Sequence, residues 1–153
     1  MAIYLVQHGK ALSEEEDPQR PLSEEGIKET THMASVAEYY MLPVRKIVHS
    51  DKLRSRQTAE IFAKKLRLEE KLESDVRLSP AAQVKDFAAD LTPDMNTMFV
   101  GHLPFMQKLL SLLVTGSEEH RIFAFQNSGI ICLDKDNAAQ EWHIKWTLSR
   151  NID

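Results

Sequence analysis

Two histidines of this chain stand directly after short apolar runs, and each has a glycine beside it. His8 lies in "YLVQHG" and His102 lies in "MFVGH". An imidazole titrates near neutral pH, so a large fraction of it is unprotonated and able to act as a nucleophile or to transfer protons. One histidine in such a context is often structural, but two in the same context are a stronger signal. We therefore take His8 and His102 as candidate catalytic residues.

A third segment, "HSDKLRSRQTA", adds positive charge to this pair. Arg54 falls in the first turn of the helix predicted over 53–68. A cation near a helix N-terminus is unfavourable for the helix dipole, which favours a role for Arg54 in holding an anion. A guanidinium group binds phosphate oxygens in a bidentate manner. Arg56 falls on another face of the helix and is expected to face solvent.

Three small features are expected to shape the site. Gly9 and Gly101 lack side chains, which predicts close approach of a ligand to the backbone beside each histidine. Pro104 suits the first turn of a helix, whose amide groups and positive dipole end would then face an anion near His102. His49 ends a further apolar run and is interpreted as structural.

The elements that carry these residues alternate between strands and helices. The alternation predicts a single α/β domain over residues 1–153, a three-layer sandwich with a mostly parallel central sheet flanked by helices and a C-terminal antiparallel hairpin. In such sheets ligands bind outside the carboxyl ends of the strands, where both candidate histidines lie. The predicted strands are 3–6, 45–50, a third within 73–80, 96–102 and the hairpin 128–148 with its turn at 136–139. The predicted helices are 23–42, 53–68, 81–91 and 103–114.

Composition excludes several classes of protein. The net charge of -4 gives no reason to expect nucleic acid or an anionic membrane surface as a partner. The longest apolar run, 109–114, is too short to span a bilayer, and the N-terminal "MAIYLV" is too short for a signal peptide. The single cysteine, Cys132, lies in an apolar run and is expected to be a buried hydrophobe without a disulfide partner. We expect a cytoplasmic protein.

Four segments together resemble the histidine phosphatase superfamily, and in particular its SixA-like phosphohistidine phosphatases. They are "LVQHGKA", "RPLSEEG", "SDKLRSRQTA" and "VGHLP", which occur in the order and spacing of the family's motifs across nearly the whole chain. The resemblance implies a phosphoglycerate mutase-like fold without an inserted helical cap. It also implies a hydrolase that needs no cofactor and no metal, acts on phosphorylated protein or a small phosphorylated substrate, and releases inorganic phosphate.

The resemblance also implies a role for each matching residue. His8 would be the nucleophile that takes the phosphoryl group, His102 its partner across the phosphate, and Arg54 a clamp. The remaining residues implied at the phosphate are Gln7, Gly9, Arg20 and Leu103. Phosphoryl transfer depends on positioning and on positive charge around the transferred oxygens, which suits these residue types. A phosphohistidine intermediate splits one difficult step into two easier ones.

Two positions depart from the family's pattern. Gln7 stands where the family has arginine, so one charged contact with phosphate is replaced by a neutral one; Arg20 or Lys10 would have to replace part of the charge. Gln83 is the nearest match to the family's carboxylic acid, and nothing singles out Glu73, Asp75 or Asp86 as a substitute. The sequence therefore favours a phosphohistidine substrate, because its leaving imidazole needs little help from an acid.

Three alternatives remain open. The two glutamines would also suit a phosphate- or phosphoprotein-binding module that has lost turnover. A small-molecule phosphomonoesterase would use the same site on another substrate. A metal site built on His8 and His102 lacks a third ligand at a recognisable spacing.

Overall fold

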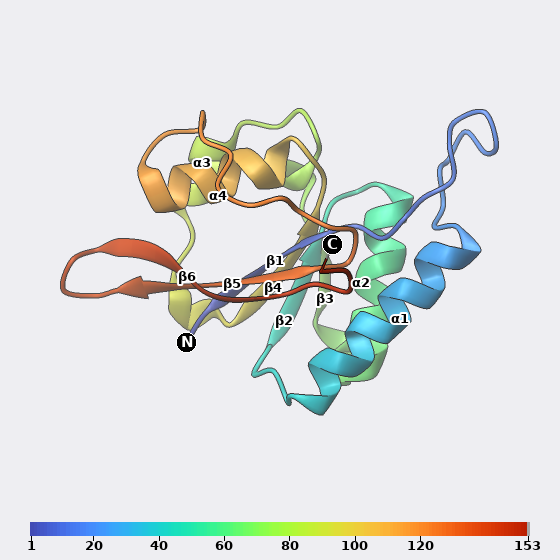
Figure 1. Cartoon of the computed structure of the whole chain (residues 1–153), viewed down its shortest axis with the longest axis horizontal. Helices are drawn as coiled ribbons and strands as arrows, with labels where there is room; N and C mark the ends of the chain where they lie inside the picture. The colour runs from blue at the N-terminus through green and yellow to red at the C-terminus, as the bar shows by residue number, and fades with distance from the viewer. Residues whose placement is uncertain (153) are drawn as a thin grey trace.

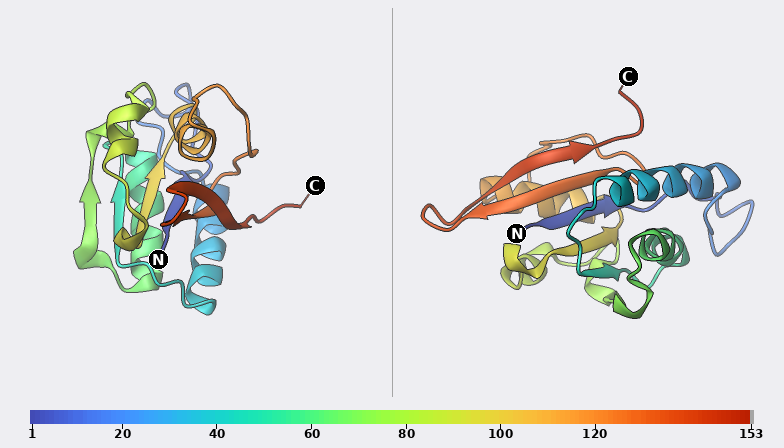
Figure 2. Two further views of the ribbon diagram at one scale, coloured as in Figure 1. Left: turned by 90° about the vertical axis from the view of Figure 1, so that its left-hand side faces the viewer. Right: turned by 90° about the horizontal axis from the view of Figure 1, so that it is seen from below.

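The computed structural model describes residues 1–152, which form three layers (Figure 1). A six-stranded sheet lies between two pairs of helices, as the side views in Figure 2 also show. In spatial order the strands are β3 (Leu72–Ser74), β2 (Lys46–His49), β4 (Thr97–Gly101), β1 (Ile3–Gln7), β5 (Ile130–Asp136) and β6 (Glu141–Leu148). Helices α1 (Glu24–Tyr39) and α2 (Leu53–Leu66) cover one face, and α3 (Val84–Ala89) and α4 (Phe105–Thr115) cover the other.

The sheet is parallel from β3 to β1 and antiparallel at β5 and β6. This arrangement confirms the predicted sandwich with its C-terminal hairpin. The segment 73–80 differs in part from the prediction, because the strand ends at Ser74 and a 3₁₀ turn follows at Val76–Leu78. The Asp75 carboxylate accepts the Arg77 amide and starts that turn. Two more 3₁₀ turns occupy Glu69–Lys71 and Pro93–Met95.

Burial on both faces explains the continuous apolar run of β1. Ile3 and Leu5 pack against the α3–α4 layer, while Tyr4 and Val6 pack against the α1–α2 layer, and none of the four is more than 2% exposed. A strand with helices on both sides has no solvent-facing residues, so its sequence need not alternate. Cys132 is likewise buried, in the layer of Tyr4 and Val6.

The ends of two helices lie close to the candidate histidines. Ser23 caps α1 by accepting the Gly26 amide at 3.0 Å. Pro104 precedes α4 as its capping residue, after a cis peptide bond, whereas we expected it inside the first turn. The Met106 amide donates to the His102 carbonyl at 2.8 Å. This bond occupies the amide of the second residue of α4; that the start of α4 faces an anion stays a prediction.

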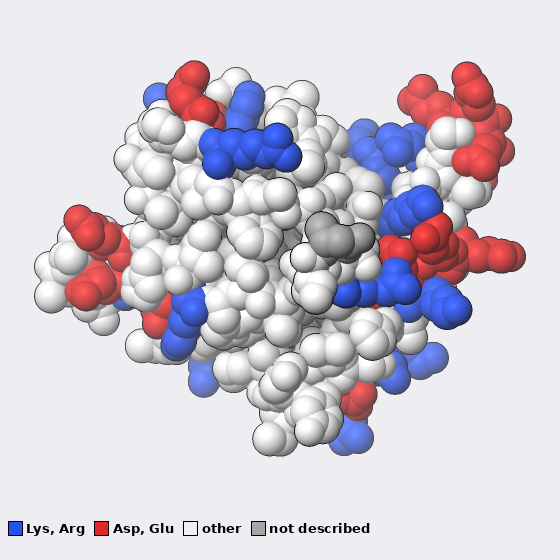
Figure 3. All heavy atoms as spheres, viewed as in Figure 1, with Lys and Arg blue, Asp and Glu red and all other residues white. Residues whose placement is uncertain are grey.

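The segment between β1 and α1 projects from the molecule. Residues 12–20 form a loop at the upper right of Figure 1, and Figure 3 shows acidic side chains gathered there beside basic ones at its base. Glu14, Glu15 and Glu16 are exposed in this loop. Within residues 1–152 no helix combines the length and apolar character needed to cross a membrane.

Candidate active site

Pairing of β1 with β4 places the two candidate histidines side by side. Gln7 lies opposite Gly101 in the parallel register, and the His8 amide donates to the Gly101 carbonyl at 3.0 Å. The imidazole rings of His8 and His102 have centroids 4.9 Å apart and planes inclined at 53°. Two residues 94 positions apart in the sequence therefore meet at one edge of the sheet.

The His8 ring is oriented by its own backbone. Its Nδ1 lies 2.7 Å from the Gly9 carbonyl oxygen, which can only accept, so Nδ1 carries the proton and Nε2 keeps its lone pair. Burial lowers the pKa of His8 to about 4; the bond to the Gly9 carbonyl opposes this, and the charges of Arg54 and Arg20 lower the pKa further. At neutral pH His8 is an uncharged ring with a free nucleophilic nitrogen.

The His102 ring is held by a buried serine. His102 Nε2 lies 2.5 Å from Ser50 Oγ, and the Lys52 amide donates to the same oxygen at 3.3 Å. With that amide as a donor to it, the Ser50 hydroxyl can send its own proton to Nε2, which leaves the proton of His102 on Nδ1. Burial lowers the pKa of His102 to about 3, assisted by His8 and by the charges of Arg54, Lys52 and Arg20. The Nδ1 atom is buried and has no hydrogen-bond partner.

Arg54 occupies the first turn of α2, as predicted, and its Nε is buried without a partner. No carboxylate of residues 1–152 forms an ion pair with it. Burial and the charge of Arg20 lower the pKa of Arg54, and Glu14 opposes this. Arg56, in contrast, points outward and pairs with Glu60 at 3.3 Å.

Arg20 lies beside Arg54 although the two come from different segments. Both line an open pocket of about 460 Å³, whose other residues are Glu14, Pro18, Gln19, Asp51, Lys52 and Leu53. The Arg20 Nε donates to the Leu12 carbonyl at 3.0 Å, which fixes the arginine against the projecting loop. The course of this loop was not readable from the sequence. Lys52 and Glu14 were missed because Lys52 stands at a position that its motif segment leaves unspecified and Glu14 lies in none of the motif segments.

Lys10, Gly9 and Gly101 make close contacts within the fold. Lys10 is paired with Glu25, so its charge is not available to replace the missing arginine. The Gly9 amide donates to Thr58 Oγ1 at 2.8 Å, and a Cβ at Gly9 would stand 2.4 Å from Thr30 Oγ1. A Cβ at Gly101 would meet Met106 Sδ at 3.1 Å. Close packing against Thr30 explains Gly9, whereas the neighbour at Gly101 is a flexible methionine side chain; that the two glycines let a ligand approach the backbone stays a prediction.

Gln7 and Leu103 line a second pocket of about 240 Å³. Its remaining residues are Glu29, Phe125, Gln126, Asn127, Arg150 and Asn151. The Gln7 Oε1 atom is buried and has no hydrogen-bond partner. Leu103 is 37% exposed at the position after His102. The pocket of Gln7 and Leu103 shares no residue with the pocket of Arg20 and Arg54.

None of the candidate acids is placed to serve the histidines. Gln83 is an exposed residue before α3, Glu73 pairs with Lys46 at 2.6 Å, and Asp75 pairs with Arg77 at 2.9 Å. Asp86 is exposed in the first turn of α3. No carboxylate is among the groups that shift the pKa of either histidine. Within residues 1–152, no three His, Cys, Asp or Glu side chains are grouped so that they could share a metal ion.

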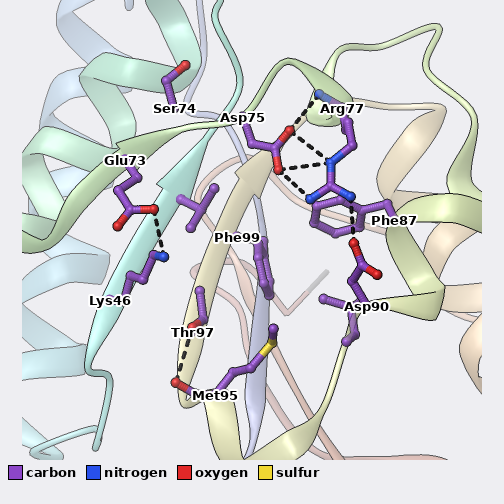
Figure 4. Close-up of a pocket in the computed structure, with 12 residues that line it drawn as sticks. Lys46, Glu73, Ser74, Asp75, Arg77, Phe87, Asp90, Met95, Thr97 and Phe99 are labelled. Atoms are coloured by element: carbon purple, nitrogen blue, oxygen red, sulfur yellow. Dashed lines mark hydrogen bonds and ion pairs between the residues drawn. The ribbon is translucent and has the colours of Figure 1, made fainter.

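Another pocket, of about 230 Å³, lies beside α3 over the face of β2 and β4 (Figure 4). Its charged side chains point toward one another. Arg77 bonds to Asp75 and, at 2.7 Å, to Asp90, and its guanidinium lies 5.3 Å from the centroid of the Phe87 ring. Lys46 and Glu73 form the other pair drawn there. This pocket contains none of the residues predicted for the site.

Comparison with known proteins gives consistent results. Residues 3–79 match the model of the histidine phosphatase superfamily (branch 1). The solved structure of the protein histidine phosphatase SixA complexed with tungstate is similar with a TM-score of 0.83 and 26% identity, over 97% of each chain. The α-ribazole phosphatase from Shigella flexneri shares the fold, with a TM-score of 0.79 and 14% identity over 100% of this chain and 98% of that one. An uncharacterized protein of Picosynechococcus sp. is 29% identical over 94% of this chain and 90% of its own length.

Proposed function

The chain belongs to the histidine phosphatase superfamily, and from that membership we propose that it is a phosphohistidine phosphatase acting through a phosphorylated His8. Membership of the superfamily does not fix the substrate, because similar structures include both SixA and the α-ribazole phosphatase. The proposal selects phosphohistidine on a protein among them.

One observation carries the proposal. Within residues 1–152, the buried side-chain nitrogen and oxygen atoms without a hydrogen-bond partner are Gln7 Oε1, Arg54 Nε and His102 Nδ1. A buried polar group without a partner costs free energy, so Arg54 Nε and His102 Nδ1, which both belong to residues near His8, indicate a missing acceptor there. Both are donors, and the Gln7 amide brings a donor of its own, Nε2. A tetrahedral anion beside His8 Nε2 accepts from such donors.

The reaction would proceed in two steps at one site. The His8 Nε2 lone pair attacks phosphorus and the bond to the leaving group breaks; water then attacks the phosphorus of phospho-His8 and releases inorganic phosphate. Arg54 and Arg20 stabilise the charge on the transferred oxygens, and His102 Nδ1–H donates to one of them. The low pKa values of both rings keep them uncharged, so the nucleophile is available at neutral pH.

The choice of substrate rests on the finding that no carboxylate is among the groups that shift the pKa of either histidine, and that Glu29, which lines the pocket of Gln7, is paired with Arg150. An alkoxide leaving group needs a proton from an acid, whereas an imidazole leaves readily without one. A phosphohistidine therefore suits this site better than a sugar phosphate does. An open site without an inserted cap also suits a phosphorylated protein surface. We place the reaction in the cytoplasm, where an unpaired cysteine such as Cys132 is normal.

Gln7 supports a second candidate, a module that binds phosphate with little turnover. Replacing a charged hydrogen bond by a neutral one removes about 1–2 kcal/mol. If the contact is made mainly in the transition state, the rate falls by roughly 10²–10³. Arg20 and Arg54 remain as clamps, so we favour a slowed enzyme over a binding module.

Mixing the protein with a phosphohistidine peptide tests the proposal. We expect phosphate on His8, detected by mass spectrometry under conditions that preserve phosphohistidine, followed by release of inorganic phosphate. His8→Ala should show neither, while His32→Ala, an exposed histidine of α1, should show both. Phosphate binding without phosphorylation of His8 would support the module, and faster hydrolysis of a sugar phosphate than of the peptide would contradict the proposed substrate.

A further inference from the structure

The open pocket of Arg20 and Arg54 is built from two segments of the chain. The loop after β1 contributes Glu14, Pro18, Gln19 and Arg20, and the connection from β2 into α2 contributes residues 51–54. Figure 3 shows the acidic side chains of the loop beside the basic ones at its base. The pocket that holds the two proposed phosphate clamps therefore also carries negative charge.

The two carboxylates of this pocket differ in what they contact. Asp51 Oδ1 accepts a hydrogen bond from Ser79 Oγ at 3.1 Å. Glu14 is exposed and forms no ion pair with any residue of 1–152. Its charge acts on the pKa of Arg54 and is not among the charges that shift the pKa of either candidate histidine. The Glu14 carboxylate is thus available to a group that enters the pocket beside Arg54.

The fold of the loop fixes where Glu14 lies. The Leu12 amide donates to the Pro21 carbonyl at 2.9 Å and closes the base of the loop. Inside the loop, the Glu16 carboxylate accepts the Ser13 amide at 2.9 Å. Glu16 is therefore used within the loop itself, whereas Glu14 faces the pocket that the loop shares with α2.

A carboxylate in this position needs an explanation, because it repels the phosphate that the pocket is proposed to hold. A phosphoryl group with two negative charges is matched by Arg20 and Arg54. The charged side chains that then remain in the pocket are Lys52, Glu14 and Asp51, and together they are negative. A substrate that brings a positive group beside its phosphoryl group would offset this charge.

We propose that Glu14 binds a basic side chain of the substrate protein, and that the enzyme prefers a phosphohistidine with lysine or arginine one or two positions away. The inference rests on the proposed function and names a feature of the substrate outside the phosphoryl group. An extended chain advances about 3.5 Å per residue, so a side chain this close in sequence stays beside the phosphate. Glu14 is then a residue that determines specificity and takes no part in making or breaking bonds.

This role has a kinetic signature. An ion pair that is equally strong in the bound substrate and in the transition state lowers KM and leaves kcat unchanged. A carboxylate that merely offsets the charges of the two arginines would change all substrates alike. The preference between two peptides therefore separates recognition by Glu14 from a structural role.

The test compares two phosphohistidine peptides of one sequence, with lysine or glutamine at the positions that flank the phosphohistidine. The measured quantities are kcat and KM for each peptide in wild type, Glu14→Gln and Glu14→Lys. Glu15→Gln is the matched control, since Glu15 is exposed in the same loop and does not line the pocket.

We expect wild type to prefer the lysine peptide by about three- to five-fold in kcat/KM, the usual effect of an exposed ion pair, with the difference in KM. The preference should vanish in Glu14→Gln, reverse in Glu14→Lys and persist in Glu15→Gln. It should also shrink in wild type at high salt, because salt screens exposed charges.

A small substrate without a positive group should respond in the opposite direction. Glu14→Gln removes a charge that repels phosphate, so kcat/KM for p-nitrophenyl phosphate should rise about two-fold while the lysine peptide becomes a poorer substrate. A fall for both substrates would contradict the inference.

Failure of the inference and failure of the proposed function give different results. If wild type forms phospho-His8 from both peptides with equal kcat/KM, or if Glu14→Gln and Glu15→Gln lower the preference equally, the inference about Glu14 is wrong and the proposed function stands. If wild type forms no phospho-His8 from either peptide, the proposed function itself fails.

Discussion

Two arginines of this molecule have similar sequence surroundings but differ in whether their side chains are paired. Arg77 and Arg54 each follow a strand of the parallel part of the sheet by a few residues. Arg77 bonds to two carboxylates and lies over an aromatic ring, and these partners raise its pKa (Figure 4). Arg54 has a buried Nε without a partner, and burial lowers its pKa.

The difference shows what distinguishes a structural charge from a functional one in this fold. In the pocket of Figure 4 the charged side chains are paired with one another, so these groups are not free to bind a ligand. The region around the histidines keeps two donors, Arg54 Nε and His102 Nδ1, unpaired at an energetic cost, which a bound anion would remove. The following predictions set these two regions against each other.

The largest expected effect is at the nucleophile. His8→Ala should lower kcat on a phosphohistidine peptide by about 10⁴-fold or more, because no other group can form the covalent intermediate. Stopped assays of phosphate release measure this. Asp90→Ala, in the pocket of Figure 4, should keep activity within about two-fold, since exposed ion pairs contribute little. Equal losses in the two variants would remove the distinction between the regions.

The comparison is sharpest between the two arginines themselves. Arg54→Ala should lower kcat/KM by about 10²–10³-fold, the usual effect of removing one donor from a charge-stabilising site. Arg77→Ala should leave it nearly unchanged. Added phosphate should also raise the melting temperature of wild type and Arg77→Ala but not of Arg54→Ala. Phosphate protection that depends on Arg77 would reverse the assignment.

The pH dependence tests the two buried imidazoles. Their pKa values of about 4 and about 3 lie below the ordinary value of 6.5, so the folded protein binds fewer protons than the unfolded chain between those limits. The contribution of the two histidines to the free energy of unfolding should therefore be greatest above pH 6.5. It should decline as the pH falls toward 4, by about 1.4 kcal/mol per pH unit for each histidine. Urea unfolding between pH 4 and 8 measures it.

His8→Gln provides the control for that experiment, because it removes one titrating ring and should flatten the decline. The activity of wild type should show no histidine ionisation between pH 5 and 8 in kcat/KM. A bell-shaped profile centred on pH 6.5 would mean that these rings titrate as exposed histidines do.

The smallest expected effect is the stability of the paired region. Arg77→Ala should lower the free energy of unfolding by about 1 kcal/mol or less, since the side chains of Arg77 and Asp90 are exposed to solvent. Chemical denaturation gives this value, and Lys46→Ala, which breaks a pair on the same pocket, should behave alike. A loss of several kcal/mol would show that this pocket is a true part of the core.

The sequence was informative wherever a residue's role follows from its strand. Continuous apolar runs identified β1 and β4, and the polar residues after them correctly indicated where two histidines meet. The sequence could not show what depends on pairing across the fold. Lys10 was expected to be able to replace part of the missing charge, and only the position of Glu25 in the fold shows that Lys10 is already paired.

The loop after β1 was the other region beyond sequence reasoning. Its course is set by distant contacts, such as the Leu22 amide bonding to Gln57 Oε1 at 2.7 Å and the Gly26 position packed on the Lys10 backbone. Arg20 therefore reaches Arg54 through tertiary contacts that no local pattern encodes. The packing of Gly9 also depends on a distant segment, because Thr30, which fills the space beside Gly9, comes from α1. The sequence around Gly9 gives no sign of this contact.

The bond between Gln126 and Asn151 has a practical consequence for anyone who purifies this protein. Asn151 lines the same pocket as Gln7, so an affinity tag fused at the C-terminal end begins within a few residues of that pocket. Rate constants measured on tagged protein would then include the effect of the tag as well as that of the substitution. Kinetic comparisons should use protein from which the added residues have been cleaved.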